Sequence, residues 1–188
     1  MFTISTLALP IQKSTAKLPE LVLASKLPSS QVSKLICLPS ISRHQGTSLY
    51  YSTIPNSLVV DLLHAMGGVI NCDTEDQLMA CMISTVYMGP LYGTMRRNRD
   101  WLMDRGGLSQ HDASRLVIQQ YQGMVQDAAD GANEGNDSIL DELIAEQTRG
   151  GLNEQALMHL HQLEAVQAYD QVMDAILSRI QGKSDGSP

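Results

Sequence analysis

The sequence predicts an incomplete α/β region followed by an all-helical domain, and three observations lead to this prediction. Short β-branched and apolar segments alternate with prolines and glycines in residues 1–73. From residue 74 onward the apolar residues recur at helical spacing, with capping residues before the expected helices. Aromatic residues form only 4% of the 188 residues while methionine occurs ten times, which favours packing between helices. We therefore expect a partial α/β region at 1–73, a helical domain at 74–181 and a disordered tail at 182–188.

Proline and glycine divide the first region into short elements. In chain order we predict a buried strand at 2–9, a short helix within 18–27, a strand at 32–38, a loop at 40–51, a helix from Pro55 to Gly67-Gly68, and a strand at 69–72. A series of strand, loop, helix and strand is typical of the last part of an α/β domain.

The helical region opens with Thr74 as a helix-capping residue, and the first helix is predicted to run to about Arg105. Within it lies the Gly89-Pro90 step, which we interpret as a kink that either allows close helix packing or exposes backbone groups to a ligand. The remaining elements are a helix capped by Ser109 and running to about Ala129, a loop at 130–137, and helices at 138–147, 152–161 and 165–180.

Charge and cysteine content exclude several classes of protein. Residues 1–60 carry a net charge of +4 and residues 61–188 carry −11, so the helical half is unsuited to binding a polyanion. The three cysteines, Cys37, Cys72 and Cys81, have no CxxC spacing, and we expect buried reduced thiols in a cytoplasmic protein. No apolar run reaches the ~18–20 residues of a membrane span.

A dinucleotide-binding domain normally opens with a strand, a glycine-rich turn and a helix, because glycine lets backbone amides approach the pyrophosphate. The motif G-x-G-x-x-G does not occur in this sequence, whose first glycine is Gly46. If the chain uses such a cofactor, we expect it to be a fragment, a truncated gene product, or a module whose partner supplies the missing half.

Two motifs together resemble pyrroline-5-carboxylate reductase. Y-M-G-P-L-Y at residues 87–92 resembles the G-S-G-P-A-Y motif of that family, and T-R-G-G-L-N at residues 148–153 resembles S-P-G-G-T-T. L-P-S at residues 38–40 stands where the family has M-P-N. The likeness covers residues 30–181 and implies the carboxyl-terminal part of a Rossmann-like domain, followed by a helical dimerisation domain of the 6-phosphogluconate dehydrogenase type.

The resemblance also implies roles for individual residues. Tyr87 replaces a glycine of the family motif, and it is the catalytic candidate because it lies near the proposed site and its hydroxyl could relay a proton. The substrate-binding candidates are Met88, Gly89, Pro90, Gly150, Gly151, Leu152 and Asn153. Leu38, Pro39 and Ser40 are expected to lie near the cofactor, NADP or NAD, and a second copy of the chain is the expected partner. Met88 replaces the serine of the family motif, Arg149 a proline and Asn153 a threonine.

Each candidate also has a purely structural interpretation. The Gly150-Gly151 turn could simply end one helix and begin another, and Tyr87 could lie in a dimer interface. The arginines at 96, 97 and 99 could meet a phosphate or form a solvated helix face. His159 and His161 lie two positions apart, so they cannot chelate one metal together on a helix. The expected function is therefore NAD(P)H-dependent reduction of a cyclic imino acid, and the alternative is an inactive helical dimerisation module.

Overall fold

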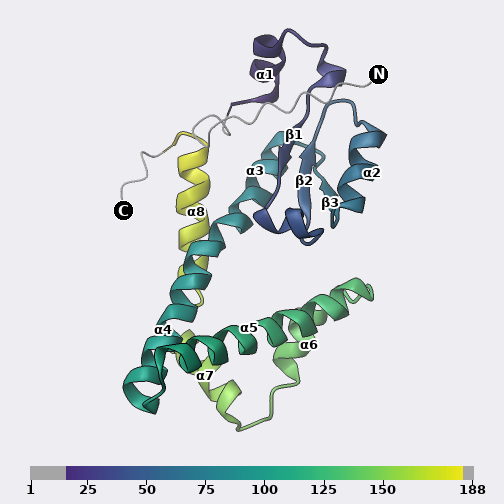
Figure 1. The fold of residues 1–188 in the computed structure, drawn as a ribbon. Helices are drawn as coiled ribbons and strands as arrows, with labels where there is room; N and C mark the ends of the chain where they lie inside the picture. Colours follow the sequence, from purple (N-terminus) through teal and green to yellow (C-terminus); the bar gives the residue numbers. More distant parts are fainter. Residues whose placement is uncertain (1–15, 184–188) are drawn as a thin grey trace. The chain divides into compact units, whose positions relative to one another are not determined.

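The computed structural model of the chain describes residues 16–183, which divide into two compact units. The second unit is Tyr87–Gln171, and the first contains the other described residues (Figure 1). The strand predicted at 2–9 and most of the tail predicted at 182–188 lie outside the described residues. Within residues 16–183, no helix combines the length and the hydropathy that crossing a membrane requires.

The first unit is built on a three-stranded sheet with the order β1-β2-β3. β1 (Lys34–Ile36) pairs antiparallel with β2 (Ser48–Tyr51), which pairs parallel with β3 (Val69–Asn71). The prediction of a loop at 40–51 was therefore wrong at its end, where Ser48–Tyr51 forms the central strand. Its middle pair, Leu49 and Tyr50, is buried on opposite faces of the sheet, which a loop at the surface would not allow.

Helices α2 (Ser57–Ala65) and α3 (Glu75–Ile83) pack against the sheet, and α1 (Leu18–Ser25) lies beyond one end of its strands (Figure 1). The first unit also contains the short 3₁₀ helices η2 (Ser29–Gln31) and η3 (Pro39–Arg43). The side chain of Asn56 accepts a hydrogen bond from Leu58 N and caps α2. Thr74 accepts one from Gln77 N and caps α3, which confirms the predicted helix start.

The core of the first unit lies between the sheet and α3. Leu49, Cys72 and Leu78 form its centre, and Leu78 is fully buried. On the other face, the Tyr50 hydroxyl accepts a hydrogen bond from Asn56 N at 3.1 Å, so the buried ring keeps its polar group satisfied. Cys37 is exposed, so the expectation of a buried thiol was wrong there, because the residue lies just beyond the end of β1.

The long helix predicted from residue 74 to Arg105 is interrupted. α3 ends at Ile83, the 3₁₀ helix η4 covers Ser84–Tyr87, and a new helix, α4, runs over Met88–Gly106. Pro90 is the third residue of α4, where a backbone N–H has no partner within the helix and its loss costs little. The proposed kink at Gly89-Pro90 is therefore a helix start.

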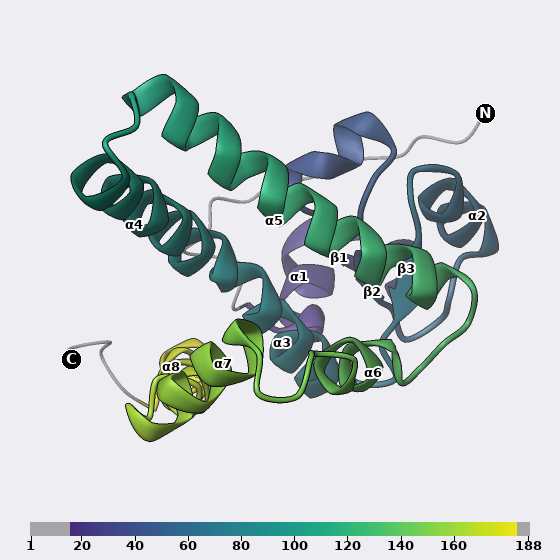
Figure 2. The ribbon, with the colours of Figure 1, turned by 90° about the horizontal axis from the view of Figure 1, so that it is seen from below.

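The second unit consists of helices alone. α5 (Gln110–Asn133) follows α4, and the two lie side by side (Figure 2). Ser109 caps α5 through Asp112 N, as predicted, but α5 continues into the segment expected to be a loop at 130–137. The later helices of this unit are α6 (Ile139–Ala145) and α7 (Leu152–Gln162). The last helix, α8 (Ala168–Ile180), begins in this unit, but from Val172 onward it belongs to the first unit. All three match the predicted segments.

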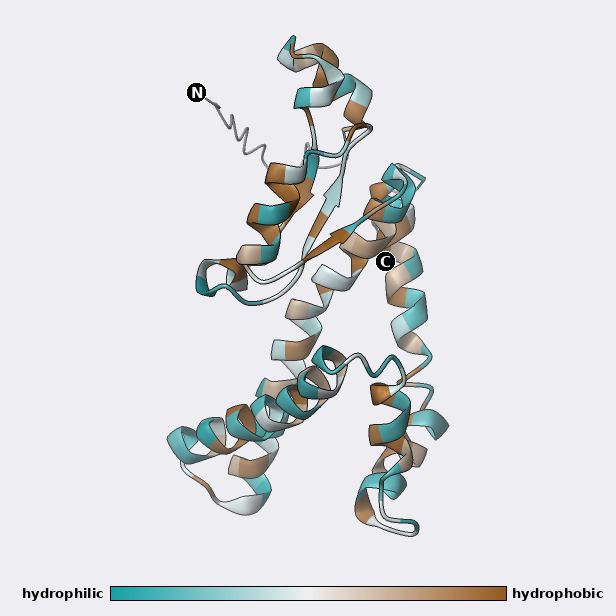
Figure 3. Ribbon diagram, turned by 90° about the vertical axis from the view of Figure 1, so that its right-hand side faces the viewer, coloured by the Kyte–Doolittle hydropathy of each residue, from teal (hydrophilic) through white to brown (hydrophobic). Residues whose placement is uncertain are grey.

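The second unit buries few apolar side chains. Among the described residues only two of its apolar side chains are fully buried, those of Ala113 and Val117 on α5. Large apolar residues remain exposed along α4 to α7, and their positions appear as brown bands in Figure 3. An isolated helix is only marginally stable in water and gains most of its stability from packing an apolar face. The helices of this unit therefore have substantial apolar surface left to pack against something else.

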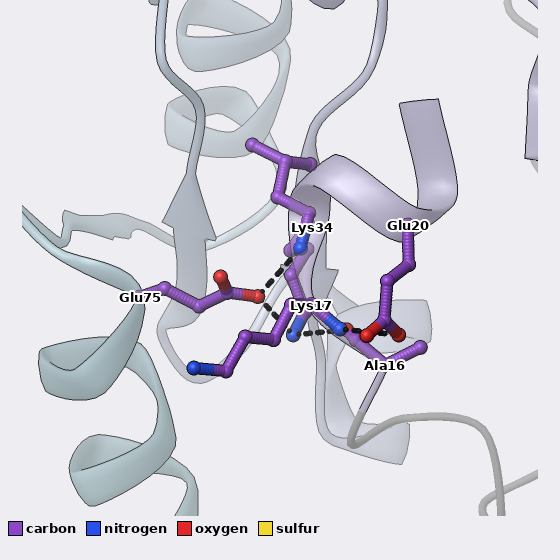
Figure 4. Close-up of polar contacts among 6 residues, drawn as sticks. Ala16, Lys17, Glu20, Lys34 and Glu75 are labelled. Carbon is purple, nitrogen blue, oxygen red and sulfur yellow. Dashed lines mark hydrogen bonds and ion pairs between the residues drawn. The ribbon is translucent and has the colours of Figure 1, made fainter. Parts of the chain in front are cut away.

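One ion pair connects three parts of the first unit. Lys34 Nζ on β1 lies 2.8 Å from Glu75 Oε1 at the start of α3, and the two side chains are only 8% and 14% exposed. The same carboxylate oxygen accepts the backbone N–H of Leu18 at 2.8 Å, while Lys34 also donates to Ala16 O at 2.9 Å (Figure 4). Strand β1, helix α3 and the start of α1 are thereby joined by one carboxylate.

We expect Glu75→Gln to lower the free energy of unfolding by about 3 kcal/mol, because it leaves the buried Lys34 ammonium without a counter-charge. Urea denaturation followed by circular dichroism measures this loss. Glu20→Gln is the matched control, since the Glu20 carboxylate only accepts an exposed backbone N–H from Lys17 at 3.3 Å. It should change stability by less than about 0.5 kcal/mol. Equal effects of the two substitutions would contradict the prediction.

Candidate functional site

The segment Leu38, Pro39 and Ser40 follows β1 directly. Leu38 is extended and caps the short helix η3, which begins at Pro39. Gly46 packs against Ser40 with a φ of +82°, and a Cβ placed there would lie 2.8 Å from Ser40 Oγ. Because β1 runs antiparallel to β2, its carboxyl end lies at the edge of the sheet where β2 begins. The expected cofactor residues therefore follow the end of a strand in the first unit, as their positions in the sequence predicted.

The fit to a dinucleotide is partial. The described residues supply the strand end, but the whole sequence has no G-x-G-x-x-G turn to bring backbone amides to a pyrophosphate. Leu38–Ser40 can account for contacts at one end of such a cofactor only.

The first predicted substrate segment forms the start of α4. Met88 and Pro90 are exposed, and a Cβ added to Gly89 would meet no atom within 4 Å. Close helix packing at Gly89 is thus not observed within the described residues. The segment follows directly on the 3₁₀ helix η4, and Tyr87, the residue before α4, already has helical backbone geometry.

Tyr87, the catalytic candidate, is held by Tyr169 of α8. The two rings stack with centroids 5.2 Å apart and an interplanar angle of 18°. The Tyr87 hydroxyl donates a hydrogen bond to the Tyr169 backbone oxygen at 3.1 Å. Desolvation raises the pKa of Tyr87 above its ordinary value, with smaller contributions from Tyr169 and Asp170. The hydroxyl therefore stays protonated at neutral pH and has to leave its acceptor before it can give a proton to a ligand.

The second predicted substrate segment connects α6 to α7. Gly150 has a φ of +73°, and Gly151 N donates to Thr148 O at 2.8 Å, so the chain makes a tight turn that favours glycine. Gly151 is the residue before α7, and no side chain caps that helix. Asn153 does not cap it either, because its side-chain amide donates to Gln147 Oε1 at 2.7 Å. Leu152 is 83% exposed.

Glu154 adds a charge to this turn that the sequence analysis did not single out. Its Oε2 accepts a hydrogen bond from Gly150 N at 2.6 Å. A carboxylate in the first turn of a helix is favoured by the partial charge there, and this pattern was the available signal in the sequence. One of the amides expected to hold a substrate carboxylate is thus occupied by the chain itself.

The predicted site residues are divided between the two units. Leu38–Ser40 belong to the first unit, whereas residues 87–90 and 150–153 belong to the second. Within the second unit, no hydrogen bond, ion pair or ring stacking recorded for the described residues links those two segments. Tyr169 was missed because nothing in the sequence pairs a residue of the last helix with Tyr87.

Among residues 16–183, no group of three or more histidine, cysteine or acidic side chains is arranged to hold a metal ion. Arg99 forms an ion pair with its neighbour Asp100 at 2.5 Å, as expected for a solvated helix face.

Comparison with known proteins shows which structures have a similar fold. No protein-family model matches the chain, and no curated protein matches it significantly. Two solved structures are similar to this chain. A pyrroline-5-carboxylate reductase from Coxiella burnetii has a TM-score of 0.70 and 20% sequence identity, and the likeness covers 88% of this chain. A Plasmodium falciparum pyrroline carboxylate reductase with NADP bound has a TM-score of 0.62 and 17% sequence identity, and the likeness covers 82% of this chain. The chain spans 62% of the length of each. It therefore has the fold of pyrroline-5-carboxylate reductases over that part of their length.

Proposed function

We propose that this chain is a divergent, NAD(P)H-dependent reductase of a cyclic imino acid and acts at an interface between two copies of itself. The observation that carries the proposal is the fold likeness, which extends over 88% of the chain and includes both units. Glycines at the starts of α4 and α7 add support, since those helix starts carry the two motifs of the resembled family.

The chemistry of imine reduction assigns a task to each segment. The reduced nicotinamide, when bound, supplies the hydride. The backbone amides of Leu152 and Asn153, in the first turn of α7, suit the substrate carboxylate because the helix dipole favours an anion there. Met88, Gly89 and Pro90 would contact the substrate from the start of α4, and Tyr87 is the candidate for the proton.

NADP is the first cofactor to test, because one of the two similar structures contains it, and NAD is the alternative. Leu38, Pro39 and Ser40 would lie near the nicotinamide. We propose a cytoplasmic location, and the three free cysteines support it, because thiols persist in reducing compartments.

A second candidate function is an inactive helical module that forms dimers without binding a cofactor. The absence of G-x-G-x-x-G from the sequence favours it, because the pyrophosphate then lacks its usual backbone cradle. The two candidates differ in one measurable property, the binding of the nicotinamide cofactor.

We expect NADPH to raise the melting temperature of the full chain, because a ligand that binds only the native state stabilises it. The gain is about 2.7 kcal/mol when the ligand is present at 100 times its dissociation constant. Differential scanning fluorimetry with NADPH, NADH and adenosine as a control measures the shift. An unchanged melting temperature at millimolar NADPH and NADH would favour the inactive module.

We expect Tyr87→Phe to lower the melting temperature, because it removes the hydrogen bond to Tyr169 and keeps the stacked ring. Folding raises the pKa of Tyr87. The contribution of its hydroxyl to stability is therefore complete below the pKa of the unfolded chain, which is about 10, and is lost as the pH rises through the pKa of the folded chain. The difference between wild type and variant should therefore be constant from about pH 7 to 9 and shrink above about pH 10. Tyr92→Phe, at a 62% exposed position, is the control and should have no effect.

The dimer is proposed from the exposed apolar surface of the second unit. Ile118 and Val125 are seven residues apart on α5, so they lie on one face, and they are 54% and 62% exposed. Leu140 on α6 and Leu163 after α7 are 66% and 75% exposed. Apolar surface of this extent usually marks a site of protein contact.

We expect size-exclusion chromatography with light scattering to give about twice the chain mass of 20.6 kDa at micromolar protein. The double substitution Ile118→Glu and Val125→Glu should shift the protein toward monomer, because it places charges in the proposed interface. Leu23→Glu with Leu58→Glu is the matched control, since both residues are exposed but belong to the first unit. A monomeric wild-type chain would contradict the proposal.

A further inference from the structure

Two of the three cysteines meet in the core of the first unit. Cys72 directly follows β3 and is only 7% exposed, in the cluster that also contains Leu49 and Leu78. Cys81 lies on α3 and is partly buried, and its side chain packs against the same cluster. Leu78 and Cys81 are three residues apart, so they share the face of α3 that is turned to the sheet. The fold therefore brings together two thiols from different elements.

The two thiols differ in their surroundings. Desolvation raises the pKa of Cys72 above its ordinary value, and the neighbouring Cys81 thiol and Asp73 raise it further. Cys72 therefore stays protonated at neutral pH, and its burial shields it from reagents in solution. Cys81 is only partly buried, so it is the thiol of this pair that a small reagent reaches first.

Cys37 lies apart from this pair. It follows β1, and its Sγ donates a hydrogen bond to Oγ of Ser48, the first residue of β2, at 3.4 Å. Cys72 follows β3, which runs parallel to β2, and Cys72 N donates to Tyr50 O at 2.8 Å. Cys37 and Cys72 therefore lie toward opposite ends of β2, and the exposed Cys37 serves as an internal control.

We propose that Cys72 and Cys81 are a covalent modification site, at which a low-molecular-weight disulfide oxidises the two thiols to one reversible disulfide bond. The Cys81 thiolate attacks one sulfur of the reagent, whose S–S bond breaks and releases one thiol. Cys72 then loses its proton and attacks the Cys81 sulfur, and the second thiol leaves. The protons of both cysteines pass to the two released thiols. The pair is oxidised by two electrons, and the reagent is reduced by the same two.

This bond would act on the start of α3. It closes a loop of ten residues, 72–81, which contains the capping residue Thr74 and the carboxylate of Glu75 that joins α3 to β1. A disulfide stabilises a protein mainly by restricting its unfolded chain. Oxidation therefore strengthens the attachment of α3 to the sheet, and reduction weakens it again. Disulfides in reducing compartments are usually transient, which fits a response to oxidants rather than a permanent cross-link.

The test is mass spectrometry of the full chain carrying Cys37→Ser, first reduced and then exposed to 2-hydroxyethyl disulfide. This reagent exchanges with thiols and, unlike a peroxide, leaves the ten methionines unoxidised. We expect the intact mass to fall by about 2 Da, the mass of the two hydrogens that leave. Cleavage after Glu75 cuts the chain between the two cysteines, so their peptides stay together only when a disulfide joins them. Dithiothreitol should separate the peptides.

The oxidised chain should also melt at a temperature roughly 5–10 °C above that of the reduced chain. Adding Cys81→Ser to the Cys37→Ser chain is the matched control, and it should abolish both the mass loss and the rise in melting temperature. The joined peptides identify the bond directly, so the test does not depend on how well the variant folds.

Three outcomes would overturn the inference. They are two free thiols after oxidation, a stable mixed disulfide on Cys81 without joined peptides, and a bond between Cys37 and Cys72 or Cys81 in the wild-type chain. No nicotinamide takes part in this chemistry, so its result is separate from the cofactor test, and either proposal can fail alone.

Discussion

The first unit depends on the buried contact between Lys34 and Glu75. One carboxylate oxygen receives both the Lys34 ammonium and the Leu18 backbone N–H, so a strand, a helix start and the segment before α1 meet at one point. Breaking such a pair leaves a charge in a site from which water is largely excluded, and this penalty exceeds the value of an exposed ion pair. Glu75 follows the capping residue Thr74, so the same turn that begins α3 also fixes it to β1. The packing of Leu78 against Leu49 then follows from where α3 begins.

Local signals were enough to predict most of the helices, because their starts are encoded within a few residues. Thr74 and Ser109 cap α3 and α5 through the third residue of each helix, and both starts were predicted. The central strand β2 was missed because Ser48–Tyr51 follows a polar stretch and has little apolar alternation of its own. Its strand conformation depends on pairing with β1 and β3, which are distant in the sequence. The helix break before Met88 was missed for a related reason, since a proline within an apolar run fits both a kink and a helix start.

The sequence was enough to locate the segments of the candidate site, but it did not indicate the hydrogen-bond partners of their residues. The sequence located the turn at Gly150-Gly151, which lies directly before α7. It located the Gly89-Pro90 step as well, but as a kink within a helix rather than at the helix start that the structure shows. It did not indicate that Tyr87 donates to Tyr169, because 82 residues separate them. It also did not indicate that Glu154 reaches back to Gly150, although the two lie four residues apart. A carboxylate in the first turn of a helix can face solvent or the turn, and only the local backbone geometry decides between these positions.

The turn before α7 is held by interactions within the chain itself. The left-handed backbone at Gly150 requires glycine or a strained residue, so this position is constrained by geometry. Gly151 N donates to Thr148 O at 2.8 Å, and Gly150 N donates to Glu154 Oε2 at 2.6 Å, so the residues before the turn and the first turn of α7 both fix its path. The carboxylate of Glu154 also lies where the helix dipole favours an anion. The geometry of the turn therefore follows from its own sequence, because the glycines allow the backbone conformation and Glu154 satisfies one of the amides that this conformation exposes.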